Sequence, residues 1–441
     1  MGWPMGLIER KSVDGFVDRL KSGIWRQLEN RQQKSSHSCV TRAYQGRISG
    51  KYTILIFCWL GWLITAANRQ VIDVTKKEII DEFNLSLLSA GLGLDLTFWA
   101  LYICTALFGG LMSDRIGRKK LIVPSMFLFS VMMWTTGLAG NFVTLVIFRA
   151  LAGASIGAFF PVAASFVAET FPKEVRSKAI GLYLTGAILG SIIGWTSAGY
   201  VVQTFKSWRL SFQVCAVPMF IVGLLFWLIV KEKPQEYESK TTFKSTARTL
   251  FSVPNLLYLW GFAALDLFEI WTIDDWLVFY FREKIGMTPI LAAATKGACA
   301  ASGMAGAVLL GWVADRFGRK PTLIGTLICD AICLFLVTLI PPSAPYFLTL
   351  TLSMATSFFE LGEFSSLYTF IIESAPAGNY GGSMGFTIFF GNLGGMTGSP
   401  IAGFFTDKFN NLNWLLYIPI AAAIAQLPVA NAAKEEALKK L

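Results

Sequence analysis

The chain has 441 residues, of which 54% are hydrophobic and only 15% are charged. This composition excludes a soluble enzyme, because apolar runs of roughly 20 residues, each long enough to cross a hydrocarbon core, recur along most of the chain. The formal net charge of +10 does not indicate a nucleic-acid partner, since the Lys and Arg residues concentrate in the tails and in alternate connections. We therefore expect an all-α membrane protein with the lipid bilayer as its solvent.

Residues 1–50 form a basic tail without an apolar run, so we expect no cleaved signal peptide. Val13, Phe16, Val17 and Leu20 recur at three- and four-residue steps within it. An amphipathic helix at the membrane interface and an unstructured basic tail remain equal alternatives here.

Twelve transmembrane helices follow the tail. The connections after the second, fourth, sixth and eighth carry Lys and Arg clusters, so the positive-inside rule predicts that both termini are cytoplasmic. The helices are expected near 52–72, 87–112, 121–139, 142–167, 178–203, 211–230, 255–281, 289–313, 321–340, 345–373, 381–405 and 412–433. The predicted units are the tail, a six-helix bundle over 51–230, a cytoplasmic linker over 231–254, a second bundle over 255–433 and a cytoplasmic tail over 434–441.

An internal repeat relates the two bundles. Residues 110–119 read G-L-M-S-D-R-I-G-R-K, and residues 311–320 read G-W-V-A-D-R-F-G-R-K, a displacement of 311 − 110 = 201 residues. A Glu-x-x-Pro pattern at 169–172 recurs in the same order at 373–376. Such ordered matches indicate duplication, and they predict two pseudo-symmetric six-helix bundles.

The repeated G-x-x-x-D-R-x-G-R-K loop resembles the signature of the major facilitator superfamily of transporters. The resemblance implies that these loops latch the two bundles together on the cytoplasmic side, and that transport breaks and remakes the latch. The implied latch residues are Gly110, Asp114, Arg115, Gly117, Arg118, Gly311, Asp315, Arg316, Gly318 and Arg319.

Two further patterns are similar to that superfamily. Arg149 lies in R-A-L-A-G on the fourth helix, and Glu169 is followed seven residues later by Arg176. The second half repeats the acid as Glu373 but has Tyr380 in place of the arginine. The resemblance implies a charge network of Arg149, Glu169, Arg176 and Glu373.

Arg69 is a charged residue near the end of the apolar first helix. The segment Ala67-Asn68-Arg69 resembles the first helix of the anion:cation symporter branch, which carries organic and sugar acids and has Asp-Arg at this point. The resemblance implies that Arg69 lines the central cavity and pairs with a substrate carboxylate, which its planar fork suits. Asn68, which replaces the aspartate, is the neighbouring candidate for substrate binding.

Several carboxyl groups lie inside predicted helices, where an ionisable group is costly and marks a functional site. Glu269 and Glu360 are candidates for substrate binding. Because the single histidine, His37, lies in the tail, any coupled proton is expected on these acids. Static pairing with Arg69, Arg149 or Lys296 is the structural alternative. The candidates for proton coupling are Asp95, Asp266, Glu269, Glu360 and Glu363.

These features predict a monomeric secondary transporter in the plasma or inner membrane that takes up a small organic or sugar acid with protons by alternating access. The alternatives are a proton-coupled carrier of a neutral sugar or polyol, an efflux antiporter and a transporter-like sensor. No nucleophile–base set, metal cluster or phosphate loop is present in the sequence. We therefore expect no enzymatic activity, no metal and no cofactor other than the coupling proton.

Overall fold

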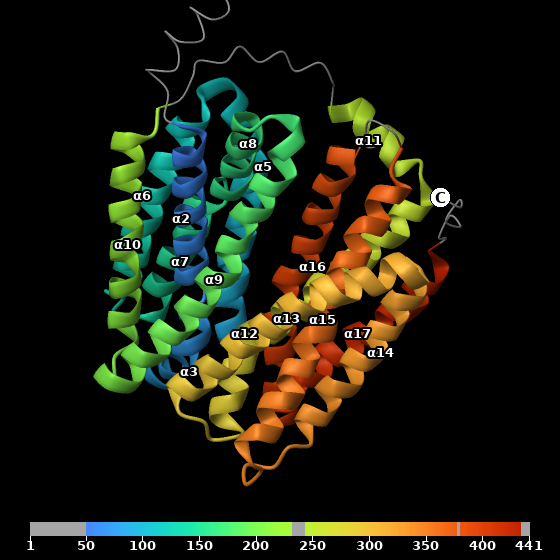
Figure 1. The fold of residues 1–441 in the computed structure, drawn as a ribbon. Helices are drawn as coiled ribbons and strands as arrows, with labels where there is room; N and C mark the ends of the chain where they lie inside the picture. The colour runs from blue at the N-terminus through green and yellow to red at the C-terminus, as the bar shows by residue number, and fades with distance from the viewer. Residues whose placement is uncertain (1–49, 232–242, 377–379, 434–441) are drawn as a thin grey trace, which may run out of the picture. The chain divides into compact units, whose positions relative to one another are not determined.

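The computed structural model describes residues 50–231, 243–376 and 380–433. The predicted amphipathic helix of the tail lies outside this range. Every regular element within it is helical (Figure 1), as expected where each backbone polar group must find its partner inside its own segment.

The first half contains six spans, three of which are interrupted. The first span is α2 and α3, the second is α4, η1 and α5, and the fourth is α7 and α8. The bounds are α2 Lys51–Arg69, α3 Val71–Phe83, α4 Leu87–Ala90, η1 Gly91–Leu96, α5 Thr97–Ile116, α6 Arg118–Thr136, α7 Phe142–Ile156, α8 Phe159–Thr170, α9 Lys173–Phe205 and α10 Trp208–Ile229.

The second half begins with a short helix in the predicted linker and continues with six spans. The bounds are α11 Phe243–Phe251, α12 Pro254–Glu283, α13 Pro289–Phe317, α14 Arg319–Thr338, α15 Tyr346–Ser374, α16 Tyr380–Phe409 and α17 Trp414–Ala432. The described residues thus contain the twelve expected spans, and nine of these are long and apolar enough by themselves to cross a membrane.

The first span is longer than the sequence predicts. Its apolar run ends near residue 72, but α3 continues the helix to Phe83. The residues that made this stretch look like a loop include Asp73 and Lys76, and both are buried. Their polar groups find partners inside the protein, so the helix continues beyond the hydropathy signal.

The repeated loop has the same backbone geometry in both halves. Gly117 separates α5 from α6, and Gly318 separates α13 from α14, each with a φ of 102°. This conformation favours glycine because a side chain would crowd the following carbonyl oxygen. The repeat therefore preserves a backbone requirement, which supports duplication.

Glycines set the closest helix contacts in both bundles. A Cβ atom added to Gly190 of α9 would lie 2.0 Å from the carbonyl oxygen of Leu63 in α2. One added to Gly394 of α16 would lie 2.0 Å from the carbonyl oxygen of Ala264 in α12. Helices associate in membranes through such small-residue seams, and here the seam occupies matching places in the two halves.

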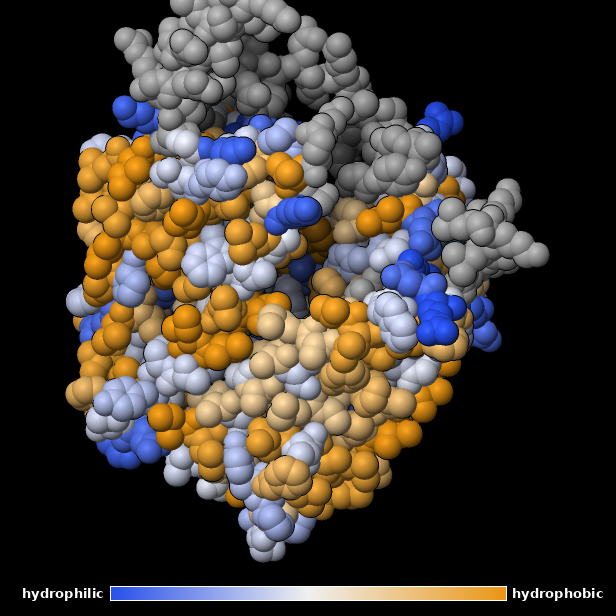
Figure 2. Space-filling model, in the orientation of Figure 1, coloured by the Kyte–Doolittle hydropathy of each residue, from blue (hydrophilic) through white to orange (hydrophobic). Residues whose placement is uncertain are grey.

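The outer surface of the helices is largely hydrophobic. Figure 2 shows this face as mainly apolar, with most of the hydrophilic residues near its margins, including the right-hand one. Exposed apolar side chains include Phe220, Trp227, Val308 and Phe347. A surface of this kind suits contact with lipid chains rather than with water.

Candidate functional site

A cavity of about 150 Å³ lies between helices of the two halves. Gln70, between α2 and α3, and helix α9 contribute one wall, and α12, α13 and α15 contribute the other. The lining residues are Gln70, Ala187, Ile188, Ser191, Trp195, Ile270, Asp274, Lys296, Ala300, Ser357, Glu360 and Leu361. Apolar walls with a few polar groups are typical of a binding site for a small molecule.

The positively charged residue of this cavity lining is Lys296 on α13. Its side chain is buried, its ammonium forms an ion pair with Asp274, and its Nζ lies 5.4 Å from the centre of the Trp195 ring. Glu360, which was predicted to bind substrate, also lines the cavity, and its Oε1 has no hydrogen-bond partner within the described residues. The cavity therefore offers a cation that is held by one carboxylate and faces a second acid.

The first half supplies neutral polar groups to the same cavity. The amide of Gln70 donates to the hydroxyl of Ser191 at 2.8 Å, which joins the end of α2 to α9. Sequence reasoning missed both residues because uncharged polar groups in an apolar helix give no signal of their own. A solute that replaces this hydrogen bond would find both a donor and an acceptor.

Arg69 lies beside this cavity, directly before Gln70 at the end of α2. Its guanidinium lies 4.4 Å from the centre of the Trp99 ring, and its Nε has no partner among the described residues. Trp99 in turn stacks on Trp271 of the second half, with ring centres 3.8 Å apart. Arg69 is thus held by a cation–π contact, and one of its donors remains unused.

Asn68 has a different environment from that expected of a substrate ligand. It is buried, and its amide donates to the carbonyl of Ile64 one turn earlier, at 2.9 Å. Its Oδ1 has no partner within the described residues, and Asn68 is absent from the cavity lining. Its predicted contact with substrate remains a prediction.

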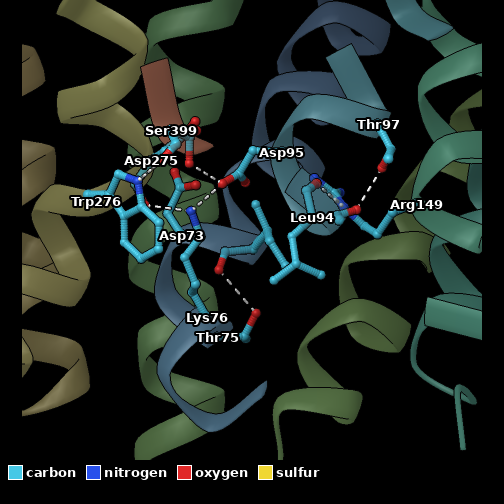
Figure 3. Close-up of polar contacts among 12 residues, drawn as sticks. Asp73, Thr75, Lys76, Leu94, Asp95, Thr97, Arg149, Asp275, Trp276 and Ser399 are labelled. Atoms are coloured by element: carbon cyan, nitrogen blue, oxygen red, sulfur yellow. Dashed lines mark hydrogen bonds and ion pairs between the residues drawn. The ribbon is translucent and has the colours of Figure 1, made fainter. Parts of the chain in front are cut away.

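A buried charge network around Lys76 of α3 joins the two halves (Figure 3). The ammonium of Lys76 is fully buried and donates to Asp95 of η1 and to the backbone carbonyl of Asp275 in α12, both at 2.8 Å. Asp95 also accepts from Ser399 of α16 at 2.5 Å. The Lys76–Asp95 pair lies within the first half, whereas the contacts of Lys76 with the Asp275 carbonyl and of Asp95 with Ser399 join the halves, so separating the halves here would break these two contacts.

Aromatic side chains enclose this network. Lys76 lies 4.4 Å from the centre of the Trp276 ring, and the indole of Trp276 donates to the Ser399 carbonyl at 3.0 Å. Asp73, one turn before Lys76, accepts from the indole of Trp195 at 2.8 Å. Since Trp195 also lines the cavity, Asp73 links the charge network to the candidate binding site.

Further polar contacts between the halves lie around the network. Arg282 of α12 donates to Glu78 of α3, and Lys77 is paired with Glu283. The carboxylate of Asp407 in α16 accepts two backbone N–H groups at the start of α4, at 3.0 and 2.8 Å. We call this the paired end of the molecule, because several ion pairs and hydrogen bonds join the halves there.

The opposite ends of the helices carry the repeated basic loops. Arg118 is buried and pairs with Glu169 at 2.5 Å, and Arg319 pairs with Glu373 at 3.3 Å. Arg319 also forms an ion pair with Asp315. Each of these pairs joins residues of one half, and the two Arg–Glu pairs occupy corresponding places in the repeat.

The structure describes the surroundings of only some of the other predicted latch residues. Gly110, Asp114 and Arg115 lie in α5, but their side chains are outside the described part. Gly311 is half-buried in α13, and Arg316 is exposed beside the Trp312 ring. Their role in a latch remains a prediction.

Neither Arg149 nor Arg176 belongs to the two Arg–Glu pairs described above. Arg149 is buried, donates from Nε to the Leu94 carbonyl at 3.4 Å and lies 4.5 Å from the centre of the Phe98 ring. It therefore fixes the fourth span to η1. The Nε of Arg176 has no partner within the described residues.

The structure separates the candidates for proton coupling into two groups. Asp95 belongs to the charge network with Lys76, whereas the others belong to the second half. Asp266 and Glu269 lie on α12, and Glu360 and Glu363 lie on α15, all buried. A further buried acid, Asp330 of α14, lies near them but is absent from the cavity lining.

Sequence reasoning missed Lys76 and Asp274 as functional residues, and it considered Lys296 only as a static partner. A usable signal existed for Lys296, which is an isolated lysine in an apolar helix. For Lys76 there was little local signal, because charged neighbours made the segment resemble a loop. Its burial depends on partners that lie 19 and 199 residues away along the chain.

Comparison with known proteins finds similarity to one superfamily of transporters. The family model described as Major Facilitator Superfamily matches residues 58–399 and, separately, 304–430. The cis,cis-muconate transport protein of Acinetobacter baylyi is 25% identical over 370 residues, which cover 79% of this chain and 86% of that protein. The hexuronate transporter of Bacillus subtilis is 27% identical over 382 residues, which cover 81% and 88%.

Solved structures of similar fold are also transporters. A bacterial homologue of the human lysosomal transporter Spinster, in an inward-facing and occupied conformation, has a TM-score of 0.75 at 18% identity, with 86% of this chain and 95% of that chain covered. A D-xylose–proton symporter has a TM-score of 0.73 at 18% identity, with 88% and 99% covered. At this identity the likeness concerns the fold alone.

Proposed function

Because the chain belongs to the major facilitator superfamily, and is thus a multi-pass membrane transporter rather than an enzyme, we propose that it takes up a small organic or sugar acid together with protons. The observation that carries the proposal is Lys296, a buried ammonium in the cavity between the halves. The named relatives that carry muconate and hexuronate have substrates of this class.

A substrate carboxylate would compete with Asp274 for the ammonium of Lys296. An ammonium and a carboxylate form a charge-assisted hydrogen bond, which is stronger inside a low-dielectric cavity than in water. Arg69 is the second cation for such a substrate, because it lies next to Gln70 and keeps an unused Nε donor. A sugar acid would use its hydroxyl groups to replace the hydrogen bond between Gln70 and Ser191.

Competition for Lys296 also supplies a route to proton coupling. When a substrate carboxylate takes the ammonium, Asp274 and Glu360 lose their neutralising charge. Two carboxylates without a cation hold a proton more tightly, so anion binding favours proton binding. The substrate and the proton would then cross together, because each binds more tightly while the other is bound.

The proposed orientation follows from the basic loops. The positive-inside rule assigns the loops at Gly117 and Gly318 to the cytoplasm, with both termini on that side. The paired end would then face outward and be closed, so the cavity would open toward the cytoplasm. We propose that the protein acts in this way as a monomer in the plasma or inner membrane.

The experiment is transport into proteoliposomes with an imposed inward proton gradient. We expect gradient-driven accumulation of at least one sugar acid or dicarboxylate, with strong loss in Lys296→Gln and in Arg69→Lys. Lys284→Gln is the matched control, since Lys284 follows the end of α12 and does not line the cavity. Normal acid uptake by Lys296→Gln would overturn the proposal.

A neutral sugar or polyol is the second candidate, and one observation favours it. Lys296 is already neutralised by Asp274 in the cavity, which leaves no excess positive charge at that point. If the protein accumulates a hexose but no acid, and if Lys296→Gln transports it normally, this second function is the correct one.

A further inference from the structure

Acidic side chains gather in the second half of the protein, behind the wall of the cavity. They come from three helices, and each is at most 3% exposed. The members are Asp266, Glu269, Asp330, Glu360 and Glu363. We call this set the acid cluster.

Four members of the acid cluster form two pairs between helices. The carboxyl groups of Asp266 and Glu363 are neighbours that interact electrostatically, and so are those of Glu269 and Asp330. No donor group among the described residues reaches either oxygen of Asp266, Oε2 of Glu363, Oε1 of Glu269 or Oδ1 of Asp330. As ionised groups, each pair would place two like charges together in a low-dielectric interior.

Two polar side chains beside the acid cluster also have an atom without a hydrogen-bond partner among the described residues. Gln426 of α17 is fully buried and donates to Glu269 at 2.6 Å, but its own Oε1 has no donor among the described residues. Ser366, one turn after Glu363, is buried and its hydroxyl has no partner in the same range. A buried amide oxygen without a donor, next to two carboxyl groups, indicates that a hydrogen-bond donor is missing there. A proton bound to a carboxyl group, or the group that carries such a proton, would be that donor.

The surroundings offer little compensating positive charge. Lys296 of α13 faces Glu360, but it is already paired with Asp274. Other titratable groups that face the cluster among the described residues are Tyr368 of α15 near Asp266, Cys333 of α14 near Asp330 and Cys299 of α13 near Glu360, all neutral at pH 7. Within the described residues, the acids are not arranged as a group that could hold a metal ion.

We infer that Asp266 with Glu363, and Glu269 with Asp330, each hold one shared proton, so that the second half stores two protons beside the substrate cavity. Two adjacent buried carboxyl groups share a proton because both cannot stay ionised together. In each pair the protonated carboxyl donates to the ionised one. Glu360, which lines the cavity one turn before Glu363, connects the store to the cavity.

The role of this store in transport rests on the proposed function, whereas the protonation itself does not. A proton from water in the cavity would bind Glu360 and then pass to a pair. Substrate that takes Lys296 from Asp274 and Glu360 would strengthen proton binding at Glu360 and hence reload the store. The pairs thereby give the symport a defined capacity of two protons in this half.

The test is infrared spectroscopy of the purified full-length protein at neutral pH, in water and in heavy water. A protonated carboxyl has a carbonyl band that shifts on deuteration, whereas an ionised one does not. We expect such a band in the wild type, one component of it lost in Glu363→Gln, and a different component lost in Asp330→Asn. Asp81→Asn is the control, because Asp81 is exposed and its loss should leave the band unchanged.

The wild-type spectrum decides the inference even if a variant fails to fold. Absence of a protonated carboxyl band in the wild type at neutral pH would overturn it, as would a band that survives in both folded variants. Transport assays separate this result from the proposed function. The band without acid transport supports the pairs and refutes the function, while acid transport without the band does the reverse.

Discussion

Lys76→Gln tests the charge network that joins the two halves at the paired end. The substitution removes the only ammonium that reaches the Asp95 carboxylate at 2.8 Å among the described residues, and both groups are buried. Leaving one member of a buried ion pair without its partner costs about 3–5 kcal/mol. Proton uptake by Asp95 relieves part of this cost, so we expect a value near the low end.

The cost falls on the state in which the paired end is closed, because Asp95 is buried there against Ser399 of the second half. Separation of the halves would let water solvate the unpaired carboxylate. Since each 1.4 kcal/mol corresponds to a factor of ten, about 3 kcal/mol raises the population open at this end roughly 100-fold. Hydrogen–deuterium exchange in nanodiscs would report the change as faster backbone exchange at the end of α3, in η1 and around Trp276.

Two variants make the reasoning refutable. Lys77→Gln is the matched control one residue away, because Lys77 is partly exposed and its pair with Glu283 is worth at most about 1 kcal/mol. In the double variant Lys76→Gln with Asp95→Asn, neither charge remains, so exchange should return toward that of the wild type. If Lys76→Gln exchanges no faster than Lys77→Gln, the network does not hold the paired end closed.

The remaining predictions concern the glycines that shape the helices. Gly190→Ala should lower the melting temperature of the detergent-purified protein strongly, because its Cβ would lie 2.0 Å from the Leu63 carbonyl oxygen, whereas Gly181→Ala, which meets nothing within 4 Å, should leave it unchanged. Equal melting temperatures would refute the close packing of α9 on α2. Gly117→Ala and Gly318→Ala should each cost about 1–2 kcal/mol, because both glycines have a φ of 102°. A calorimetric change in only one of them would contradict the equivalence of the two loops.

Much of the fold could be predicted because it depends on local signals. Apolar runs of sufficient length and a repeated loop predict twelve helices in two related halves, and both the family match and the fold confirm this. The glycine of the repeated loop even predicts a backbone feature, since Gly117 and Gly318 share one φ value. Hydropathy failed at α3, where buried charges continue a helix.

The site could be predicted only in part, because its pairings cross between distant segments. The spacing of three residues placed Asp266 and Glu269 on one helix face, but it could not show that each carboxyl pairs with a different helix. The partner that we infer for Asp266 is Glu363, and that for Glu269 is Asp330. Likewise, the contact of Lys76 with Asp275 depends on tertiary packing and leaves no periodic pattern in the sequence.

The most direct test of the central claim compares a hexuronate with the corresponding neutral hexose in proteoliposomes under an inward proton gradient. The two solutes differ chiefly in the carboxylate that Lys296 is proposed to bind. We predict that the wild type accumulates the acid and not the sugar, and that Lys296→Gln loses this accumulation. Equal accumulation of both solutes, or an unchanged preference for the acid in Lys296→Gln, would contradict the account.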